Sequence, residues 1–595
     1  MAKAQFLACL FGMTVALVYL KDIVSPFSKT HIPAYAAALM SLGCFTWIGI
    51  EYQRFLMDFS YLTLEMQILG AIAIMLTLEG IRRSTGWILL SLIGVFLLYA
   101  FIGEYVPAPL TGINSSAKEL AVYLAFDPNA LLGTPLSVVA SIVIVFILFG
   151  KVLVKTGCGE FFIDLAMAGM GRKVGGAAKI SIVGSALFGS ISGSAVSNVV
   201  TTGVMTIPLM RRSGYNKSQS GAIEAIASTG GQLMPPIMGA AAFLMAQSLE
   251  IPYSDVILAA LIPALLYYIS VFIQVDLIAV RDDISAVDAE YRTVREVMAE
   301  GWHFLIPFAI LIFAMFELNA SASMAALYAT AAITIGGFLR SYRGHQLNIH
   351  GLLDTLPDTG RSVMELIMIV GGAGLVIGLL NVSSGGFALT LALVELGNSS
   401  LTILLMVSAG VCILLGMGMP TSGVYVLLAA LVAPSLIETG IEPLAAHMFI
   451  LYFGMMSMIT PPIALAAFAA ATISEGGPMK TGLEAMRLGW VAYVIPMLFI
   501  FSPALLMQGS LVEIAIAFTV TVIGVYFISV SIVGYFKQKL NALIRWSLLI
   551  AGAFAMLPSS ILDLSYAPMV LSVVAGGALL LFLNKKVHHV GTNSA

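Results

Sequence analysis

The sequence predicts an all-α, polytopic membrane protein with about 15 transmembrane helices and two re-entrant hairpins arranged as an inverted repeat. Three observations predict this fold. First, 59% of the 595 residues are hydrophobic and only 10% are charged, whereas a soluble domain carries about 25% charged residues. Second, apolar runs of roughly 17–25 residues, long enough to cross a bilayer, recur along the chain. Third, two Gly-rich stretches align with each other. Lipid must therefore surround most of this chain.

Long apolar segments define the expected spans. They are residues 4–20, 33–50, 66–81, 86–104, 134–155, 219–249, 254–277, 303–319, 321–340, 364–382, 444–473, 488–508, 511–535, 543–559 and 566–584. Two further stretches, 176–211 and 400–437, are too long and too rich in Gly and Pro for one straight span, so each is predicted to form a hairpin. The net charge of −3 offers no basic surface to a nucleic acid, and we expect no such partner.

Basic residues in the short loops predict the orientation, because Lys and Arg concentrate on the cytoplasmic side. They lie on both flanks of 176–211, at 172–173 and 211–212, which places both ends of this stretch inside. Counting the spans onward places both ends of 400–437 outside and the C-terminus inside. The long connection 106–133 is poor in basic residues and is expected to face outward. The two stretches therefore enter the membrane from opposite faces.

An internal repeat relates the two stretches. An ungapped shift of 226 residues aligns Pro208 with Pro434, and Pro235-Pro236 with Pro461-Pro462. Gly and Ala coincidences are frequent in so apolar a chain, but aligned prolines are not. Combined with the opposite entry faces, the alignment predicts an inverted-topology repeat, which is typical of secondary transporters.

Each copy contains two points where a helix must unwind. Hairpin tips are predicted at 189–198 and 416–423, and helix breaks at 228–236 and 454–462. Pro removes a backbone N–H and Gly permits unwinding, so carbonyl oxygens are freed at membrane depth, where only protein or a watery cavity can satisfy them. Carbonyl and hydroxyl oxygens suit a hard cation such as Na⁺. The half-helix N-termini at the tips direct positive dipole ends toward an anionic substrate.

These polar residues also have a structural explanation. Any single Gly, Ser or Ala in a membrane helix commonly serves close packing, whereas four clusters in register favour ion and substrate sites. Glu224, Glu365 and His447 are the nearest ionisable residues, and all three are expected near span ends, within reach of water. Gln232, inside a break, is the better ligand candidate. The charged loop 279–302 is expected to form a solvated helix or to dock on a neighbouring element.

The motifs at the hairpins resemble those of a known family. Gly189-Ser190-Ile191-Ser192-Gly193-Ser194, followed by Met234-Pro235-Pro236, resembles the large membrane subunit of tripartite ATP-independent periplasmic (TRAP) transporters, and 416–421 with 459–462 resembles its second half. The spans before residue 105 are similar to the small membrane subunit. The fused layout and the extra C-terminal spans are similar to the subfamily served by TAXI-type binding proteins. Ser197-Asn198 is also similar to the hairpin tip of divalent-anion/sodium symporters, a related superfamily.

The resemblance implies a division of the chain into six parts. They are a four-helix, small-subunit-like domain (1–105), a periplasmic connection (106–133), the first repeat (134–280), a cytoplasmic loop with linking helices (281–363), the second repeat (364–508) and extra C-terminal helices (509–595). The first repeat contains the hairpin 176–211 and the second repeat the hairpin 400–437.

The resemblance also implies a function and a set of site residues. Such a permease works in a bacterial or archaeal cytoplasmic membrane, takes an organic acid or amino acid from a periplasmic TAXI-type binding protein, and moves it inward with Na⁺ by an elevator motion, with no other cofactor or metal. The implied Na⁺ ligands are Ser192, Gly193, Ser197, Asn198, Gly231 and Met234 at one site, and Gly418, Thr421, Ser457 and Thr460 at the other. The implied substrate contacts are Ser194, Gln232, Pro235, Pro236, Pro420, Ser422, Pro461 and Pro462.

Two other classes of protein remain open. A stand-alone Na⁺/carboxylate symporter of the same superfamily needs no binding protein, and the four leading spans argue against it. A channel or an intramembrane enzyme is a different class. The chain has no P-loop pattern and no zinc-ligand spacing, and the serines of 190–197 have no His close in sequence to act as a base, so no enzyme is indicated.

Overall fold

The computed structural model describes residues 3–21, 23, 31–286, 292–558 and 567–592. These residues are mainly helical, which confirms the predicted all-α class, and one short β-hairpin pairs Tyr535–Phe536 (β1) with Gln538–Lys539 (β2). Residues 287–291 of the charged loop, and the end residues 559 and 566 of two expected spans, lie outside the described residues.

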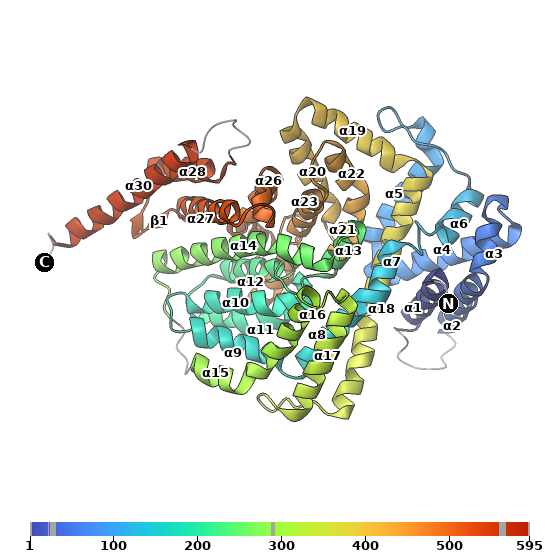
Figure 1. Ribbon diagram of the computed structural model, residues 1–595, viewed down its shortest axis with the longest axis horizontal. Helices are drawn as coiled ribbons and strands as arrows, with labels where there is room; N and C mark the ends of the chain where they lie inside the picture. Colours follow the sequence, from blue (N-terminus) through green and yellow to red (C-terminus); the bar gives the residue numbers. More distant parts are fainter. Residues whose placement is uncertain (1–2, 22, 24–30, 287–291, 559–566, 593–595) are drawn as a thin grey trace.

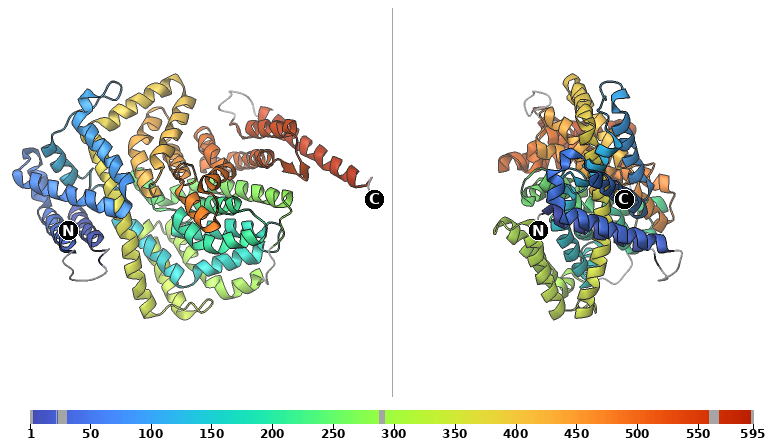
Figure 2. Two further views of the ribbon diagram at one scale, coloured as in Figure 1. Left: turned by 180° about the vertical axis from the view of Figure 1, so that it is seen from behind. Right: turned by 90° about the vertical axis from the view of Figure 1, so that its right-hand side faces the viewer.

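The N-terminal helices lie at one end of the long axis of the molecule and the C-terminal helices at the other (Figures 1 and 2). The N-terminal set comprises α1 (Lys3–Leu20), α2 (Ile32–Ile50), α3 (Tyr52–Met57), η2 (Phe59–Tyr61), α4 (Leu64–Thr85), α5 (Trp87–Ile102), η3 (Gly103–Tyr105) and α6 (Ala117–Phe126). The 34-residue helix α18 (Ile349–Val382) packs against α1, α4 and α5 on one side and against α8 (Ile144–Lys155) on the other. It therefore joins the N-terminal helices to the repeats.

The two repeats have matching orders of elements. The first consists of α7 (Thr134–Val138), η4 (Val139–Val143), α8, α9 (Cys158–Met170), α10 (Gly176–Ser192), α11 (Ala195–Arg212), α12 (Lys217–Gly231), α13 (Ala240–Ser248) and α14 (Tyr253–Arg281). The second consists of α18, α19 (Gly385–Ser399), α20 (Leu401–Gly416), α21 (Thr421–Leu431), α22 (Ala433–Glu438), α23 (Pro443–Met456), α24 (Leu465–Ser474), α25 (Pro478–Leu488), α26 (Val491–Phe501) and η6 (Pro503–Leu506). The linking elements between them are α15 (Val294–Gly301), η5 (Trp302–Phe304), α16 (Leu305–Phe316) and α17 (Ala322–Leu339).

Both predicted hairpins and both predicted breaks are present. The hairpins are α10–α11 and α20–α21, and the expected spans 219–249 and 444–473 are interrupted between α12 and α13 and between α23 and α24. The arm helices that precede the hairpins, α9 and α19, lie at opposite edges of the molecule (Figure 1). This is the arrangement expected of an inverted repeat.

Long apolar helices among the described residues account for 11 of the about 15 expected spans. Within the described residues, 11 helical segments are long and apolar enough to cross a membrane, and the remaining apolar helices have 10–17 residues. The broken helices and hairpin arms are short because each stops at a tip or a break. Conversely, α18 begins 15 residues before the expected span 364–382. Hydropathy did not predict its first half, because this half contains Pro357 and the charged side chains of Asp354, Asp358 and Arg361.

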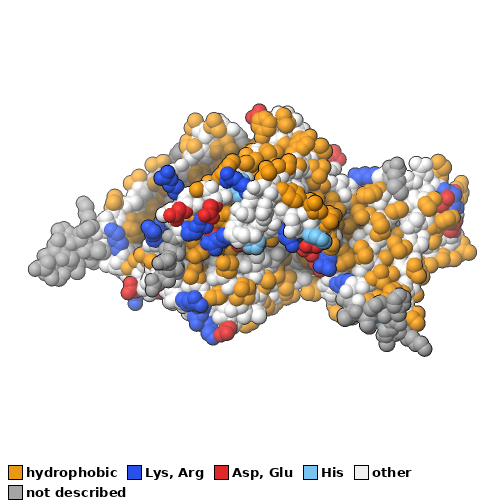
Figure 3. Space-filling view, turned by 90° about the horizontal axis from the view of Figure 1, so that it is seen from below, with side chains coloured by type: hydrophobic (Ala, Val, Ile, Leu, Met, Phe, Trp, Pro, Cys, Tyr) orange, Lys and Arg blue, Asp and Glu red, His pale blue; other side chains and the backbone are white. Residues whose placement is uncertain are grey.

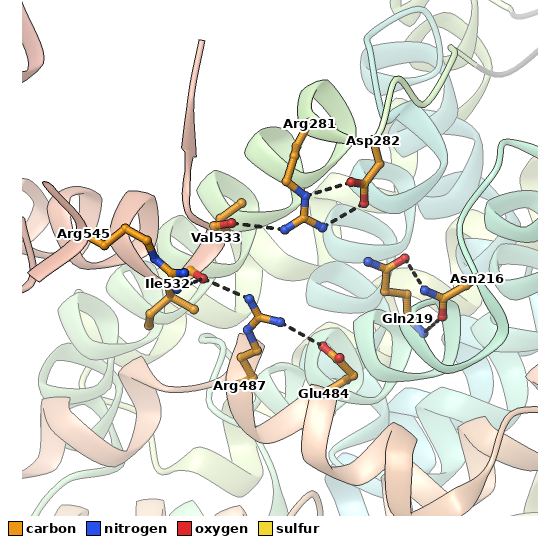
Figure 4. A network of polar contacts seen from close by, with 9 residues as sticks. All are labelled: Asn216, Gln219, Arg281, Asp282, Glu484, Arg487, Ile532, Val533 and Arg545. Atoms are coloured by element: carbon orange, nitrogen blue, oxygen red, sulfur yellow. Dashed lines mark hydrogen bonds and ion pairs between the residues drawn. The ribbon is translucent and has the colours of Figure 1, made fainter. Parts of the chain in front are cut away.

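The C-terminal helices are α27 (Leu511–Val533), α28 (Ala542–Met556) and α30 (Ala567–Thr592). Three arginines from separate helices donate to the carbonyl oxygens at the end of α27: Arg281 of α14 to Val533 at 3.1 Å, Arg487 of α25 to Ile532 at 2.9 Å, and Arg545 of α28 to Ile532 at 3.4 Å (Figure 4). Cations are favourable at a helix C-terminus, where carbonyls lack intrahelical partners. These contacts attach the C-terminal helices to both repeats.

Charged side chains gather in the central part of one face, seen from below in Figure 3, with hydrophobic side chains along its flanks. Such a distribution agrees with a polar surface outside the lipid and an apolar belt within it.

Candidate substrate and ion site at the hairpin tips

A cavity of about 570 Å³ lies where the two hairpin tips meet. The first hairpin contributes its tip from Ser192 to Ser197, and the second contributes Pro420, Thr421 and Ser422. The first break contributes Gln232, and the helices α8 and α18 close the opposite wall. The structure thus brings together eight of the predicted site residues as cavity lining: Ser192, Gly193, Ser194, Ser197, Gln232, Pro420, Thr421 and Ser422.

The first hairpin tip is shaped by a glycine and a helix cap. Gly193 ends α10 with φ of 60°, a left-handed conformation that glycine adopts at little cost. The side chain of Ser194 then caps α11 by accepting the N–H of Ser197 at 3.4 Å. The side chain of Ser197 is exposed, whereas that of the next residue, Asn198, is fully buried. The predicted ligands Ser197 and Asn198 therefore differ in environment.

Asn198 lies at the junction between the first tip and the first break. A Cβ added to Gly189 would come within 2.6 Å of both Asn198 Nδ2 and Gly231 Cα, so α10 and α12 touch through glycine backbones. Asn198 Nδ2 donates to the carbonyl of Ser185 at 3.0 Å. Gly231 is therefore required by close approach at this junction, in addition to any role of its carbonyl as a ligand.

The second tip and the second break form an equivalent junction. The hydroxyl of Ser457, at the end of α23, lies 2.9 Å from the carbonyl of Gly416 and 2.6 Å from that of Gly454. Gly418 at the tip has φ of 79°, and a Cβ there would lie 2.4 Å from Ile88 of α5. The second tip consequently contacts the N-terminal helices.

The two repeats touch directly inside the cavity. Thr421 Oγ1, at the second tip, donates to Gln232 Oε1 in the first break at 2.6 Å. The other end of this amide, Gln232 Nε2, is buried and makes no hydrogen bond with the described residues, and the same is true of Ser192 Oγ. A buried donor without a partner carries a free-energy penalty of about 1–3 kcal/mol. An acceptor placed in the cavity would remove it.

Other predicted residues face away from the cavity. Thr460 Oγ1 lies 2.7 Å from Tyr493 Oη and 2.6 Å from the carbonyl of Met456, so it bonds within the second repeat. Pro461 packs beside Gly482 of α25. The remaining predicted residues of the breaks, Met234, Pro235, Pro236 and Pro462, are partly or fully exposed and are not part of the cavity lining.

Two of the three ionisable residues differ from expectation. Glu365 is exposed, as predicted, and lines the cavity. Glu224 and His447, in contrast, do not reach water: Glu224 is 0% exposed, and His447 is 6% exposed with Nδ1 2.7 Å from the hydroxyl of Tyr425. The expectation fails because α12 and α23 run inside the bundle, covered by the hairpins and by neighbouring helices.

Sequence reasoning missed a charged residue of the cavity lining. Lys151 of α8 lines the cavity opposite the hairpin tips. Its place near the end of an apolar span is the sequence signal that could have identified it. It supplies a positive charge on the wall that faces the two helix N-termini.

Two broken helices and two hairpins that meet at one internal cavity define a polytopic membrane permease. Residues 72–514 match the family described as "Tripartite ATP-independent periplasmic transporter, DctM component". The chain belongs to this family.

Two TRAP permeases agree with this assignment. The chain is similar to the C4-dicarboxylate TRAP transporter large permease protein DctM of Pseudomonas aeruginosa, with 24% identity over 60% of this chain and 82% of the relative. It is also similar to the sialic acid TRAP transporter permease protein SiaT of Haemophilus influenzae, with 25% identity over 69% of this chain and 64% of the relative. Among solved structures, the YdaH transporter of Alcanivorax borkumensis covers 69% of this chain, with 16% identity and a TM-score of 0.44.

Proposed function

We propose that this chain is the Na⁺-coupled permease of a TRAP transporter in a bacterial cytoplasmic membrane. In this proposal it imports an organic acid that a periplasmic binding protein of the TAXI type delivers. Family membership supports the transporter class. The names of the relatives, which mention C4-dicarboxylates and sialic acid, support a carboxylate as the chemical class of the substrate.

One observation carries the proposal: the cavity at the two hairpin tips is equipped for an anion. The unpartnered Gln232 Nε2 and the side chain of Lys151 both border it. The N-terminal ends of α11 and α21 start at the tips, where backbone N–H groups and the helix dipole favour negative charge. A carboxylate accepts hydrogen bonds only and complements these donors. Glu365 of α18 also lines the cavity, and its charge opposes that of Lys151.

Two Na⁺ sites form part of the proposal. The first would use oxygens of Ser192, Gly193, Ser197 and Asn198 with the carbonyls of Gly231 and Met234. The unpartnered Ser192 Oγ supports it, because a free hydroxyl oxygen at a tip is a suitable ligand. The second would use oxygens at Gly418, Thr421, Ser457 and Thr460. The approach of Ser457 to the carbonyls of Gly416 and Gly454 supports a concentration of oxygens there.

We also propose a role for each part of the chain in the transport motion. Residues 1–105 would act as the small subunit and, with α18, would form the scaffold of an elevator. The two hairpins and broken helices would form its mobile part, and the helices of 509–595 would move with it. The arginine contacts of α14 and α25 to the end of α27 support this last point, because these two helices belong to the repeats.

Uptake by proteoliposomes tests the proposal. The purified chain would be reconstituted with a binding protein encoded beside it, and uptake of radiolabelled succinate and sialic acid would be measured with and without an inward Na⁺ gradient. We expect uptake of one probe only when both the gradient and the binding protein are present. Uptake without the binding protein would instead identify a stand-alone symporter, and single-channel currents in planar bilayers would identify a channel.

A further inference from the structure

Glu224 lies inside the first repeat, enclosed by hydroxyl groups that the proposed function does not use. Its side chain is 0% exposed. Five hydroxyls from α10, α11 and α12 contact its two carboxyl oxygens, four of them at 2.6–3.0 Å. We call this set the hydroxyl cage; its members are Ser181, Ser185, Thr202, Thr206 and Ser228.

No positive side chain balances this carboxyl group. Among the described residues, no Lys or Arg side chain forms an ion pair with Glu224; Lys179 of α10 pairs with Asp276, and Lys217 of α12 pairs with Glu475. An ionised carboxylate without a partner is strongly disfavoured in a low-dielectric interior. Hydroxyl donors offset only part of this penalty. These donors favour the ionised form, but they leave its charge unbalanced, and the candidates to balance it are a proton and a metal ion.

The spacing of the oxygens favours a proton over Na⁺. Oxygen–oxygen distances of 2.6–3.0 Å are those of direct hydrogen bonds. A metal ion would have to stand between the carboxylate and the hydroxyls and would force them apart. Packing leaves little room for this, because a Cβ added to Gly203 would already lie 3.1 Å from Glu224 Cγ.

The hydrogen bonds of the cage can accommodate one added proton. Thr206 Oγ1 contacts Glu224 Oε2 and also lies 3.1 Å from the carbonyl of Thr202. A protonated Oε2 can donate a hydrogen bond to Thr206 Oγ1. The hydroxyl of Thr206 then donates its own hydrogen bond to that carbonyl. Ser185 and Ser228 continue to donate to Oε1. Each hydroxyl then donates once, as its chemistry allows.

The cage is connected to the hairpin tip. Thr202 Oγ1 lies 2.6 Å from Glu224 Oε1, 2.9 Å from the carbonyl of Asn198 and 3.2 Å from Asn198 Oδ1. A single hydroxyl hydrogen must serve one of these acceptors at a time. The charge on Glu224 therefore determines whether Thr202 bonds to the carboxylate or to Asn198, which lies at the first tip beside Gly231.

The other titratable and charged groups on the helices around Glu224 make hydrogen bonds or ion pairs elsewhere, or lie at the helix ends. On α14, Tyr268 is the facing group, and its hydroxyl donates to the carbonyl of Ala227 at 2.9 Å. On α11, Arg211 donates to the carbonyl of Tyr215 at 2.9 Å, and the next residue, Arg212, is exposed. Helix α24 contains no titratable residue. On α10 and at the start of α12 the charged groups are Lys179 and Lys217, paired as described, and on α25 they are Lys480, Glu484 and Arg487.

We propose that Glu224 is a proton-binding site, and that protonation of its carboxyl group in the hydroxyl cage is coupled to the conformation of the first hairpin. The proton is taken from water and returned to water, and no other bond changes. The role of this proton in a transport cycle rests on the proposed function. Its binding to Glu224 does not.

Infrared difference spectroscopy tests the site directly. The full-length chain in lipid vesicles would be perfused with buffers from acid to alkaline pH, in NaCl and in choline chloride. We expect the C=O stretch of a protonated carboxyl group to disappear at alkaline pH, to be absent in Glu224→Gln, and to persist in Glu475→Gln, a matched change of an exposed glutamate. Because Glu224→Gln could misfold, Thr206→Val provides a second readout: it should shift the frequency of the band without removing it.

Several outcomes would overturn the proposal. A band that survives in Glu224→Gln, or that does not move in Thr206→Val, would assign it to another group. A carboxylate that stays ionised throughout in choline chloride and changes its stretch only on addition of Na⁺ would make Glu224 a sodium ligand. These measurements need neither substrate nor binding protein, so a failure of the uptake experiment would leave them interpretable.

Discussion

The two repeats place their helices alike but fill the space between them differently. At the shift of 226 residues, Glu224 of the first repeat corresponds to Ile450 of the second. The members of the hydroxyl cage correspond to residues without any hydroxyl, namely Val407, Val411, Leu428, Val432 and Gly454. The structure supports this equivalence, because a Cβ on Gly454 would meet Val424 and Leu428, the counterparts of Asn198 and Thr202.

This difference shows that the polar side chains around Glu224 are not needed for the packing of a hairpin on a broken helix. The second repeat shows that a hairpin can dock on a broken helix with an entirely apolar interior at these positions. The polar interior of the first repeat is therefore not a requirement of the fold. A buried network of six polar side chains is retained at an energetic cost that apolar residues of similar volume avoid. We interpret it as a functional element confined to one repeat.

The largest expected effect concerns the glycine at the first junction. Gly231 and Ser457 are equivalent positions, but a Cβ on Gly231 would lie 2.6 Å from the backbone of Gly189, where nothing flexible can yield. We expect Gly231→Ala to lower the free energy of unfolding by about 3 kcal/mol. Ser457→Ala, the matched change, removes only a hydroxyl and should lower it by about 1 kcal/mol. Denaturation by SDS in mixed micelles measures both; equal losses would show that the two junctions are packed alike.

A smaller effect is expected from the cage itself. Thr202→Val keeps the shape of the side chain and removes a hydrogen bond to the Glu224 carboxyl group, so we expect a loss of about 2 kcal/mol of stability in the same assay. The control is Thr201→Val, the neighbouring residue, whose side chain is exposed. If both variants unfolded alike, the cage would contribute nothing to the stability of the first repeat.

Much of this arrangement could be predicted from sequence, and the failures have physical causes. Gly and Pro interrupt helices through local backbone effects, so the hairpin tips and helix breaks can be predicted from the sequence. The burial of Glu224 is not readable, because it depends on which helices cover α12. A glutamate seven residues into a short helix looks accessible until the hairpin and α24 are placed over it. The Thr421–Gln232 contact was equally hidden, since it joins residues 189 positions apart across the repeats.

The contact between the repeats gives the next prediction. Thr421→Val removes the hydrogen bond to Gln232 Oε1 and leaves the whole amide without a partner. We expect a loss of about 1 kcal/mol, because the neighbouring cavity lets water replace the lost donor. Thr421→Ser keeps the hydroxyl and should restore the stability. A variant Thr421→Ser as unstable as Thr421→Val would show that the methyl group, and not the hydrogen bond, holds the two tips together.

The smallest effect belongs to a second contact between the repeats, at the surface. Lys217 of α12 lies 2.9 Å from Glu475 at the end of α24. The hydrogen bond from Lys217 lowers the pKa of the Glu475 carboxyl group. A lowered pKa in the folded state means that the pair stabilises the protein above the ordinary pKa of glutamate and loses this contribution as the pH falls through the lowered value.

Solvent and salt screen such an exposed pair, so its contribution should be close to nothing. We expect Lys217→Ala and Glu475→Gln to change the melting temperature less than Thr421→Val does at neutral pH, and the remaining difference from the unmodified protein to vanish in acid. A larger effect at the surface than at the tips would contradict the view that the repeats are held together inside the cavity. The melting temperature in detergent, followed by tryptophan fluorescence at the two pH values and at low and high salt, decides between these outcomes.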